Sequence, residues 1–227
     1  MNQPANIDLA RLSFDEFVQF FFDRPESEQF WYADPRYALA DVSISSPLLV
    51  GHLTSLFQNF SAATSKYSAA QISYGIWAVF SPSFSLIDLL WESTIPLEKR
   101  AECIRSMASL FADFVSANEA ESLQKCFYMW WHIVVTGFWV HQGQFETPDL
   151  SQLDPEAATL FETMFGTLKQ ILAVPEPRIQ GYALHGLGHL HHPGVRDLAQ
   201  HYIDQNKERF TEEHVQWMEQ CRDGVVS

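Results

Sequence analysis

Apolar side chains recur at helical spacing along most of the chain. Phe14, Phe17 and Phe21 form one such stripe. An apolar residue at every third or fourth position places these side chains on one face of an α-helix. The same spacing, read with proline and capping residues, predicts about ten helices. They are expected at about 13–23, 47–60, 68–80, 86–91, 96–115, 119–139, 155–172, 177–190, 193–206 and 211–221.

Local start signals support these helices. Ser13 and Glu16 have the spacing of a capping box, and Pro47 and Pro155 suit the first position of a helix. No segment alternates strictly between apolar and polar residues, so a sheet is not expected. The sequence therefore predicts an all-α fold, organised as one domain over residues 1–227. Short helices joined by tight turns favour antiparallel helix pairs over a long bundle.

One hairpin near the C-terminal end carries a family resemblance. From Arg178 the chain reads R-I-Q-G-Y-A-L-H-G-L-G-H-L-H-H-P-G-V-R-D-L-A-Q-H-Y-I. This segment, about 178–203, resembles a HEAT-type helical repeat. The matching residues are Arg178, Ala183, Leu184, Gly186, Leu187, Gly188, Pro193, Val195, Leu198 and Ile203. The resemblance implies an α-solenoid of antiparallel helix pairs, an architecture that commonly presents a concave surface to a partner.

The glycines of this hairpin point to close packing. Glycine in a helix interior is less favourable than alanine by about 0.8–1 kcal/mol in helix propensity, and this helix contains Gly186 and Gly188. Small residues allow neighbouring helices to approach each other, and Gly186 lies toward the apolar stripe of its helix. We therefore expect a larger side chain at Gly186 to destabilise the fold by overpacking.

Charge and composition exclude several classes of function. The formal net charge is −14, and the five lysines do not cluster, so a nucleic-acid-binding surface is not expected. The longest apolar run, 128–140, is too short for a membrane span. No secretion signal is visible at the start of the chain, and the three cysteines are widely spaced. These features predict a cytoplasmic protein with reduced cysteines, and the acidity suits a basic partner.

The candidate site is a polar stripe on the helix at 177–190. Arg178, Tyr182, His185 and His189 share one side of this helix, roughly opposite its apolar face. They can form a groove for a partner or small ligand, or a polar face packed against a neighbouring helix. His185 and His189 also have the i, i+4 spacing of a zinc site, but no H-E-x-x-H motif is present. We predict no metal, no cofactor and no catalytic residue.

The aromatic run 127–132 leaves two interpretations open. It can line a ligand pocket, but a buried central helix has the same composition, and we favour the core interpretation. The leading functional hypothesis is a non-enzymatic protein-binding α-solenoid, such as an inhibitor or scaffold for a basic protein. The alternative is an enzyme, or a small-ligand or metal-binding protein, that uses His185 and His189. Convergence of these histidines with a third polar group in a closed pocket would favour the alternative.

Overall fold

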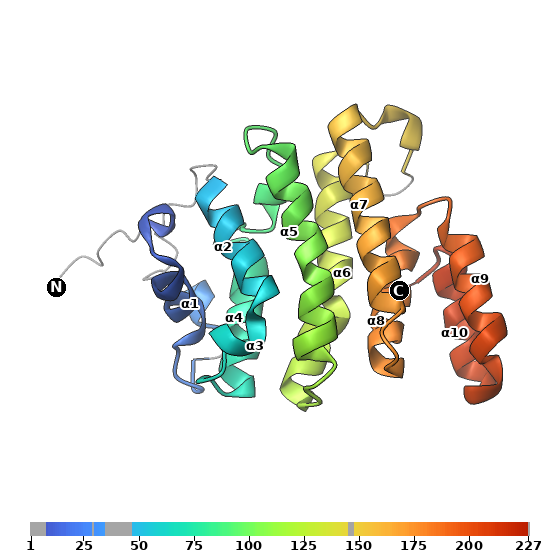
Figure 1. Ribbon diagram of the computed structural model, residues 1–227, viewed down its shortest axis with the longest axis horizontal. Helices are drawn as coiled ribbons and strands as arrows, with labels where there is room; N and C mark the ends of the chain where they lie inside the picture. The colour runs from blue at the N-terminus through green and yellow to red at the C-terminus, as the bar shows by residue number, and fades with distance from the viewer. Residues whose placement is uncertain (1–7, 29, 35–46, 145–147, 227) are drawn as a thin grey trace. The chain divides into compact units, whose positions relative to one another are not determined.

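The protein is all-helical (Figure 1). The computed structural model describes residues 8–28, 30–34, 47–144 and 148–226. These residues form ten α-helices and contain no strand. The prediction of an all-α fold with about ten helices is therefore confirmed. Within the described ranges, no helix combines the length and the hydropathy that a membrane span requires.

The chain divides into two compact units, Met1–Cys126 and Phe127–Ser227, here called unit 1 and unit 2. The boundary falls within the longest helix, α6 (Glu121–His141). The prediction of one domain over residues 1–227 stays a prediction.

Unit 1 holds the first five helices and the start of α6. They are α1 (Phe14–Phe22), α2 (Pro47–Gln58), α3 (Phe60–Ala63), α4 (Ala69–Phe80) and α5 (Leu97–Ser109). Short 3-10 turns occur at Leu9–Arg11, Trp31–Ala33 and Asp88–Leu90, the last within the segment predicted as a short helix. A π-helical segment, Leu110–Val115, continues α5.

Capping side chains define where the helices of unit 1 begin. Ser13 accepts a hydrogen bond from the Glu16 backbone N–H, and the Glu16 carboxylate accepts one from the Ser13 backbone N–H. Ser68 and Gln71 form a second capping box at the start of α4. Each box satisfies backbone donors that the first helical turn leaves without partners. The predicted box at Ser13 is therefore confirmed.

The core of unit 1 is aromatic. The rings of Phe20, Phe21 and Trp31 all contact the ring of Phe84, with centroids 5.3–5.6 Å apart. Edge-on and tilted contacts of this kind are the preferred geometry for aromatic pairs. The apolar stripe that predicted α1 therefore faces this core.

Unit 2 contains the rest of α6 and four further helices. These are α7 (Pro155–Leu172), α8 (Pro177–Leu190), α9 (Val195–Asn206) and α10 (Glu212–Asp223). Helix α8 packs against α7 and α10, and α9 packs against α10. Asp154 caps α7 by accepting from the Ala157 N–H, as the Asp154-Pro155 pair suggests. Helix α9 begins two residues after Pro193, because Pro193 and Gly194 form a turn.

Two glycines allow neighbouring helices to approach α8 closely. A Cβ atom added at Gly186 would lie 2.5 Å from Trp131 Cβ and 2.9 Å from Leu168 Cδ2. A Cβ atom added at Gly188 would lie 3.1 Å from the Cα atom of Cys221 in α10. Both glycines therefore stand where the helix has no room for a side chain, and Gly186 faces the core as expected.

Candidate functional site

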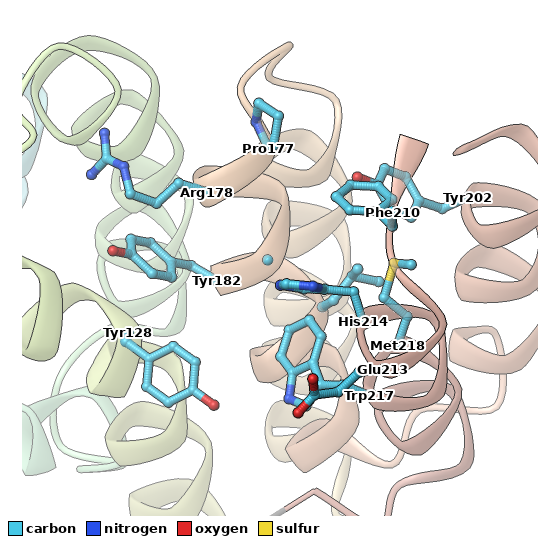
Figure 2. Close-up of a pocket in the computed structure, with 12 residues that line it drawn as sticks. Tyr128, Pro177, Arg178, Tyr182, Tyr202, Phe210, Glu213, His214, Trp217 and Met218 are labelled. Atoms are coloured by element: carbon cyan, nitrogen blue, oxygen red, sulfur yellow. The ribbon is translucent and has the colours of Figure 1, made fainter. Parts of the chain in front are cut away.

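A pocket of about 590 Å³ lies in unit 2. Residues of α6, α8, α9 and α10, and of the turn before α10, line it (Figure 2). Five of its lining side chains are aromatic: Tyr128, Tyr182, Tyr202, Phe210 and Trp217. The volume lies within the range of small-molecule and peptide-anchor sites, which are also rich in aromatic side chains.

One side of the pocket is formed by Tyr128 from α6 and Tyr182 from α8. Their ring centroids lie 6.1 Å apart at an interplanar angle of 74°. The Arg178 guanidinium lies 6.0 Å from the centre of the Tyr182 ring, and its Nε atom lies 3.8 Å from a carboxylate oxygen of Glu176. The only guanidinium of the lining set is thus already associated with an acid and an aromatic ring.

Helix α10 supplies the other side. Glu213, His214, Trp217 and Met218 have the i, i+1, i+4 and i+5 spacing of one helix face. Thr211 fixes the start of this helix, because its hydroxyl oxygen accepts from the His214 backbone N–H at 3.3 Å. Met218 is buried, Trp217 is half-buried, and Glu213 and His214 are exposed. The α10 side of the pocket therefore combines a buried thioether and a half-buried indole with two exposed polar side chains.

Three imidazoles, of His132, His185 and His189, converge between α6 and α8. We call them the imidazole cluster. The Nε2 atom of His189 lies 2.9 Å from His132 Nδ1 and 3.1 Å from His185 Nε2. His185 Nδ1 lies 3.1 Å from the carbonyl oxygen of Tyr128. A carbonyl can only accept, so neutral His185 carries its proton on Nδ1, and His189 donates from Nε2 to His185 Nε2. His132 Nδ1 then faces the same N–H as a second acceptor.

Burial holds the imidazole cluster neutral. Removal from water lowers the pKa of His132 and the pKa of His185. The pKa of His189 falls to about 3, first because of burial and then because of its imidazole neighbours. Protonation of one ring would place a positive charge in a partly buried site beside two other imidazoles, so the neutral forms are favoured.

The structure divides the predicted stripe into two parts. Arg178 and Tyr182 line the pocket, whereas His185 and His189 belong to the imidazole cluster. The stripe lies roughly opposite the apolar face of α8, but it is not open to solvent: His185 is only 1% exposed and Tyr182 only 7%, which is the packed arrangement of the two that the sequence left open. The physical reason is that α6 covers this side of α8, with the Tyr128 ring stacked 4.1 Å from the His185 ring. A binding role for the four residues stays a prediction.

Tyr128 connects the pocket and the imidazole cluster. Its side chain lines the pocket, while its carbonyl oxygen and its ring both contact His185. In the aromatic run 127–132, Phe127, Trp130 and Trp131 are buried core residues, as the core interpretation predicts, and Tyr128 lines the pocket. Trp217, Phe210 and Tyr202 were not predicted as lining residues, since each occupies an ordinary position in a helix or turn.

Other chemistry is limited in the described part of the chain. There, no group of three or more His, Cys, Asp or Glu side chains has the arrangement of a metal site. In the imidazole cluster the ring nitrogens are hydrogen-bonded to one another. All three cysteines are buried, and burial raises the pKa of the Cys103 and Cys221 thiols to about 12. These two thiols are therefore protonated at neutral pH and weak nucleophiles.

Comparison with models of protein families, with curated proteins and with solved structures found no match to this chain. The HEAT-like resemblance of 178–203 therefore rests on its own residues, and the all-helical fold is compatible with it.

Proposed function

We propose that this chain is a non-enzymatic protein-binding module that holds a peptide segment of a basic partner in the pocket of unit 2. Such a module can serve as an inhibitor or as a scaffold. The proposal includes the finer architecture expected from the sequence, a HEAT-like α-solenoid of antiparallel helix pairs. Its location is proposed to be cytoplasmic.

One observation carries this proposal: aromatic side chains from four helices and from the turn before α10 meet around a single pocket. Large rings give extensive contact area at a low cost in conformational entropy, and Trp and Tyr dominate the energetics of protein interfaces. Trp217 is half-buried in the free protein, so part of its ring remains available for contact. The acidity of the chain, with 28 acidic and 14 basic residues, favours encounter with a basic partner.

Selection of binding peptides tests the proposal. The full chain is immobilised and panned against a random peptide library, and selected peptides are measured by isothermal titration calorimetry. Trp217→Ala should weaken their binding at least about 10-fold, because interface tryptophans are frequent hot spots. Phe30→Ala is the matched control, since Phe30 is an aromatic residue of unit 1 with 63% of its surface exposed. Equal affinity of the selected peptides for the wild type and for Trp217→Ala would contradict peptide binding in this pocket.

The alternative class retains one supporting observation. His132 brings a third polar group to His185 and His189, which is the convergence that an enzyme, or a small-ligand or metal-binding protein, would need. Against it, neither His185 nor His189 lines the pocket described above. Elemental analysis of protein purified without a histidine tag separates the two. We expect no metal, whereas zinc at near-equal stoichiometry would favour the alternative.

A further inference from the structure

We infer that the pocket selects a cationic side chain, a lysine or arginine of the partner, and holds its charged group against Trp217, Tyr128 and the Glu213 carboxylate. This inference rests on the proposed function and specifies the ligand chemistry of the same site.

The first support is the position of Glu213. It precedes Trp217 by four residues on α10, so the two side chains are neighbours on one helix face. In Figure 2 the Glu213 and Trp217 side chains extend from α10 toward the same side of the pocket, and the Tyr128 hydroxyl points toward that side from α6. In the same view Arg178 lies at the opposite end of the pocket, beyond Tyr182. The acidic group and two aromatic rings therefore gather at one end.

The second support is the chemistry of these three groups. The faces of tryptophan and tyrosine rings carry negative electrostatic potential and attract ammonium and guanidinium groups. The contact of Arg178 with the Tyr182 ring shows a pairing of this kind within the site. A carboxylate beside such rings adds direct charge attraction, so Trp217, Tyr128 and Glu213 together suit a cation.

The third support is the charge balance around the pocket. Among the described residues, no lysine or arginine forms an ion pair with Glu213. The arginines of unit 2 that do form ion pairs are matched with other acids: Arg178 with Glu176, and Arg196 and Arg222 with Asp223. An anionic ligand at Arg178 would have to compete with Glu176, whereas a cationic ligand at Glu213 meets an exposed carboxylate that forms no ion pair within the described part of the chain.

Charge replacement in the ligand and in the protein tests the inference. Peptides selected on the full chain are resynthesised with each lysine changed to norleucine and each arginine to citrulline, which removes the charge and nearly keeps the size. At one basic position this change should weaken binding about 5-fold or more, through loss of the ion pair and the cation–π contact. Glu213→Gln should weaken the parent peptide to a similar degree and should have little effect on the neutral peptide.

Glu212→Gln is the matched control, because it removes the same charge one residue earlier from a side chain that does not line this pocket. Peptides that lose affinity with Trp217→Ala but are indifferent to Glu213→Gln and to their own charge would overturn the inference and leave the proposed function standing.

A smaller probe covers the case in which no peptide is selected. Tetramethylammonium chloride is titrated into the ¹⁵N-labelled protein, with tert-butyl alcohol as a neutral compound of nearly the same size and shape, and the Trp217 indole signal is followed by NMR. A saturable shift with the cation, absent with the alcohol and reduced in Glu213→Gln, would support a cation site even though the peptide-binding proposal had failed. Equal shifts with both compounds, or no shift with the cation, would overturn the inference.

Discussion

Replacement of Gly186 by alanine tests how tightly α8 packs in unit 2. On an exposed helix this change is stabilising by about 1 kcal/mol, because alanine has the higher helix propensity. At Gly186 the new Cβ atom would lie 2.5 Å from Trp131 Cβ, against an ordinary carbon–carbon separation of about 3.5–4.0 Å. Trp131 Cβ is attached directly to the backbone of α6, so it cannot move away by a change of rotamer. Relief requires α6 and α8 to separate.

Overpacking of this kind costs about 1–3 kcal/mol, and the rigid neighbour places Gly186→Ala toward the upper end. After subtraction of the gain in helix propensity, we expect a net loss of about 1–2 kcal/mol. The larger change Gly186→Leu should lose more.

Gly166→Ala provides the matched control. Gly166 lies inside α7, in the same unit, and apart from the adjoining backbone of its own helix a Cβ atom there would meet nothing within 4 Å. This variant should gain about 0.5–1 kcal/mol. Urea unfolding followed by circular dichroism measures both changes, which should have opposite signs. The reasoning would be refuted if Gly186→Ala matched or exceeded the stability of the wild type while Gly166→Ala behaved as expected.

Further predictions concern the imidazole cluster, the cysteines and a helix cap. The unfolded imidazoles bind protons below about pH 6.5, whereas burial lowers the pKa of the folded ones, so stability is full above pH 6.5 and is lost as the pH falls. Between pH 7 and 5 we expect a loss of about 1 kcal/mol in urea titrations, since partial exposure of the His132 and His189 rings reduces the effect, and a smaller slope in His189→Gln; an unchanged slope would contradict the lowered pKa values. His185→Ala should cost about 2 kcal/mol or more, since it empties a buried site and leaves the Tyr128 carbonyl without this donor; a loss under 0.5 kcal/mol would indicate an exposed histidine. Ellman's reagent should label none of the three cysteines in the native protein and all three in denaturant; rapid native labelling would contradict their burial. Ser68→Ala should cost about 1 kcal/mol in thermal unfolding, through loss of the α4 capping box; an unchanged melting temperature would mean that the cap contributes nothing.

Helix positions were predictable because their signals are local. Ser13 with Glu16, and Asp154 with Pro155, mark helix starts by side-chain chemistry that acts over three or four residues. The π-helical continuation of α5 was not predictable in this way, since Leu110–Val115 has an ordinary apolar stripe. The wider turn of a π-helix is a feature of the backbone, and the spacing of apolar side chains in this segment does not predict it.

The candidate site was predictable only in part. Periodicity showed that Arg178, Tyr182, His185 and His189 share a side of one helix, and this holds in the structure. It did not show which other helix covers that side. Burial of His185 by Tyr128, and the meeting of Trp217 with three tyrosines around one pocket, depend on contacts between residues far apart in the sequence. The pattern of apolar and polar residues within one helix does not predict those contacts.

The close fit of α8 on two sides makes its length more constrained than its composition. Each residue of an α-helix turns the following ones by about 100°. One residue inserted or deleted between Pro177 and Gly186 would move Gly186 away from Trp131 and His185 away from the Tyr128 carbonyl in a single step. Natural variants of this chain should therefore accumulate insertions and deletions in its connecting segments, while α8 accepts substitutions but keeps its residue count.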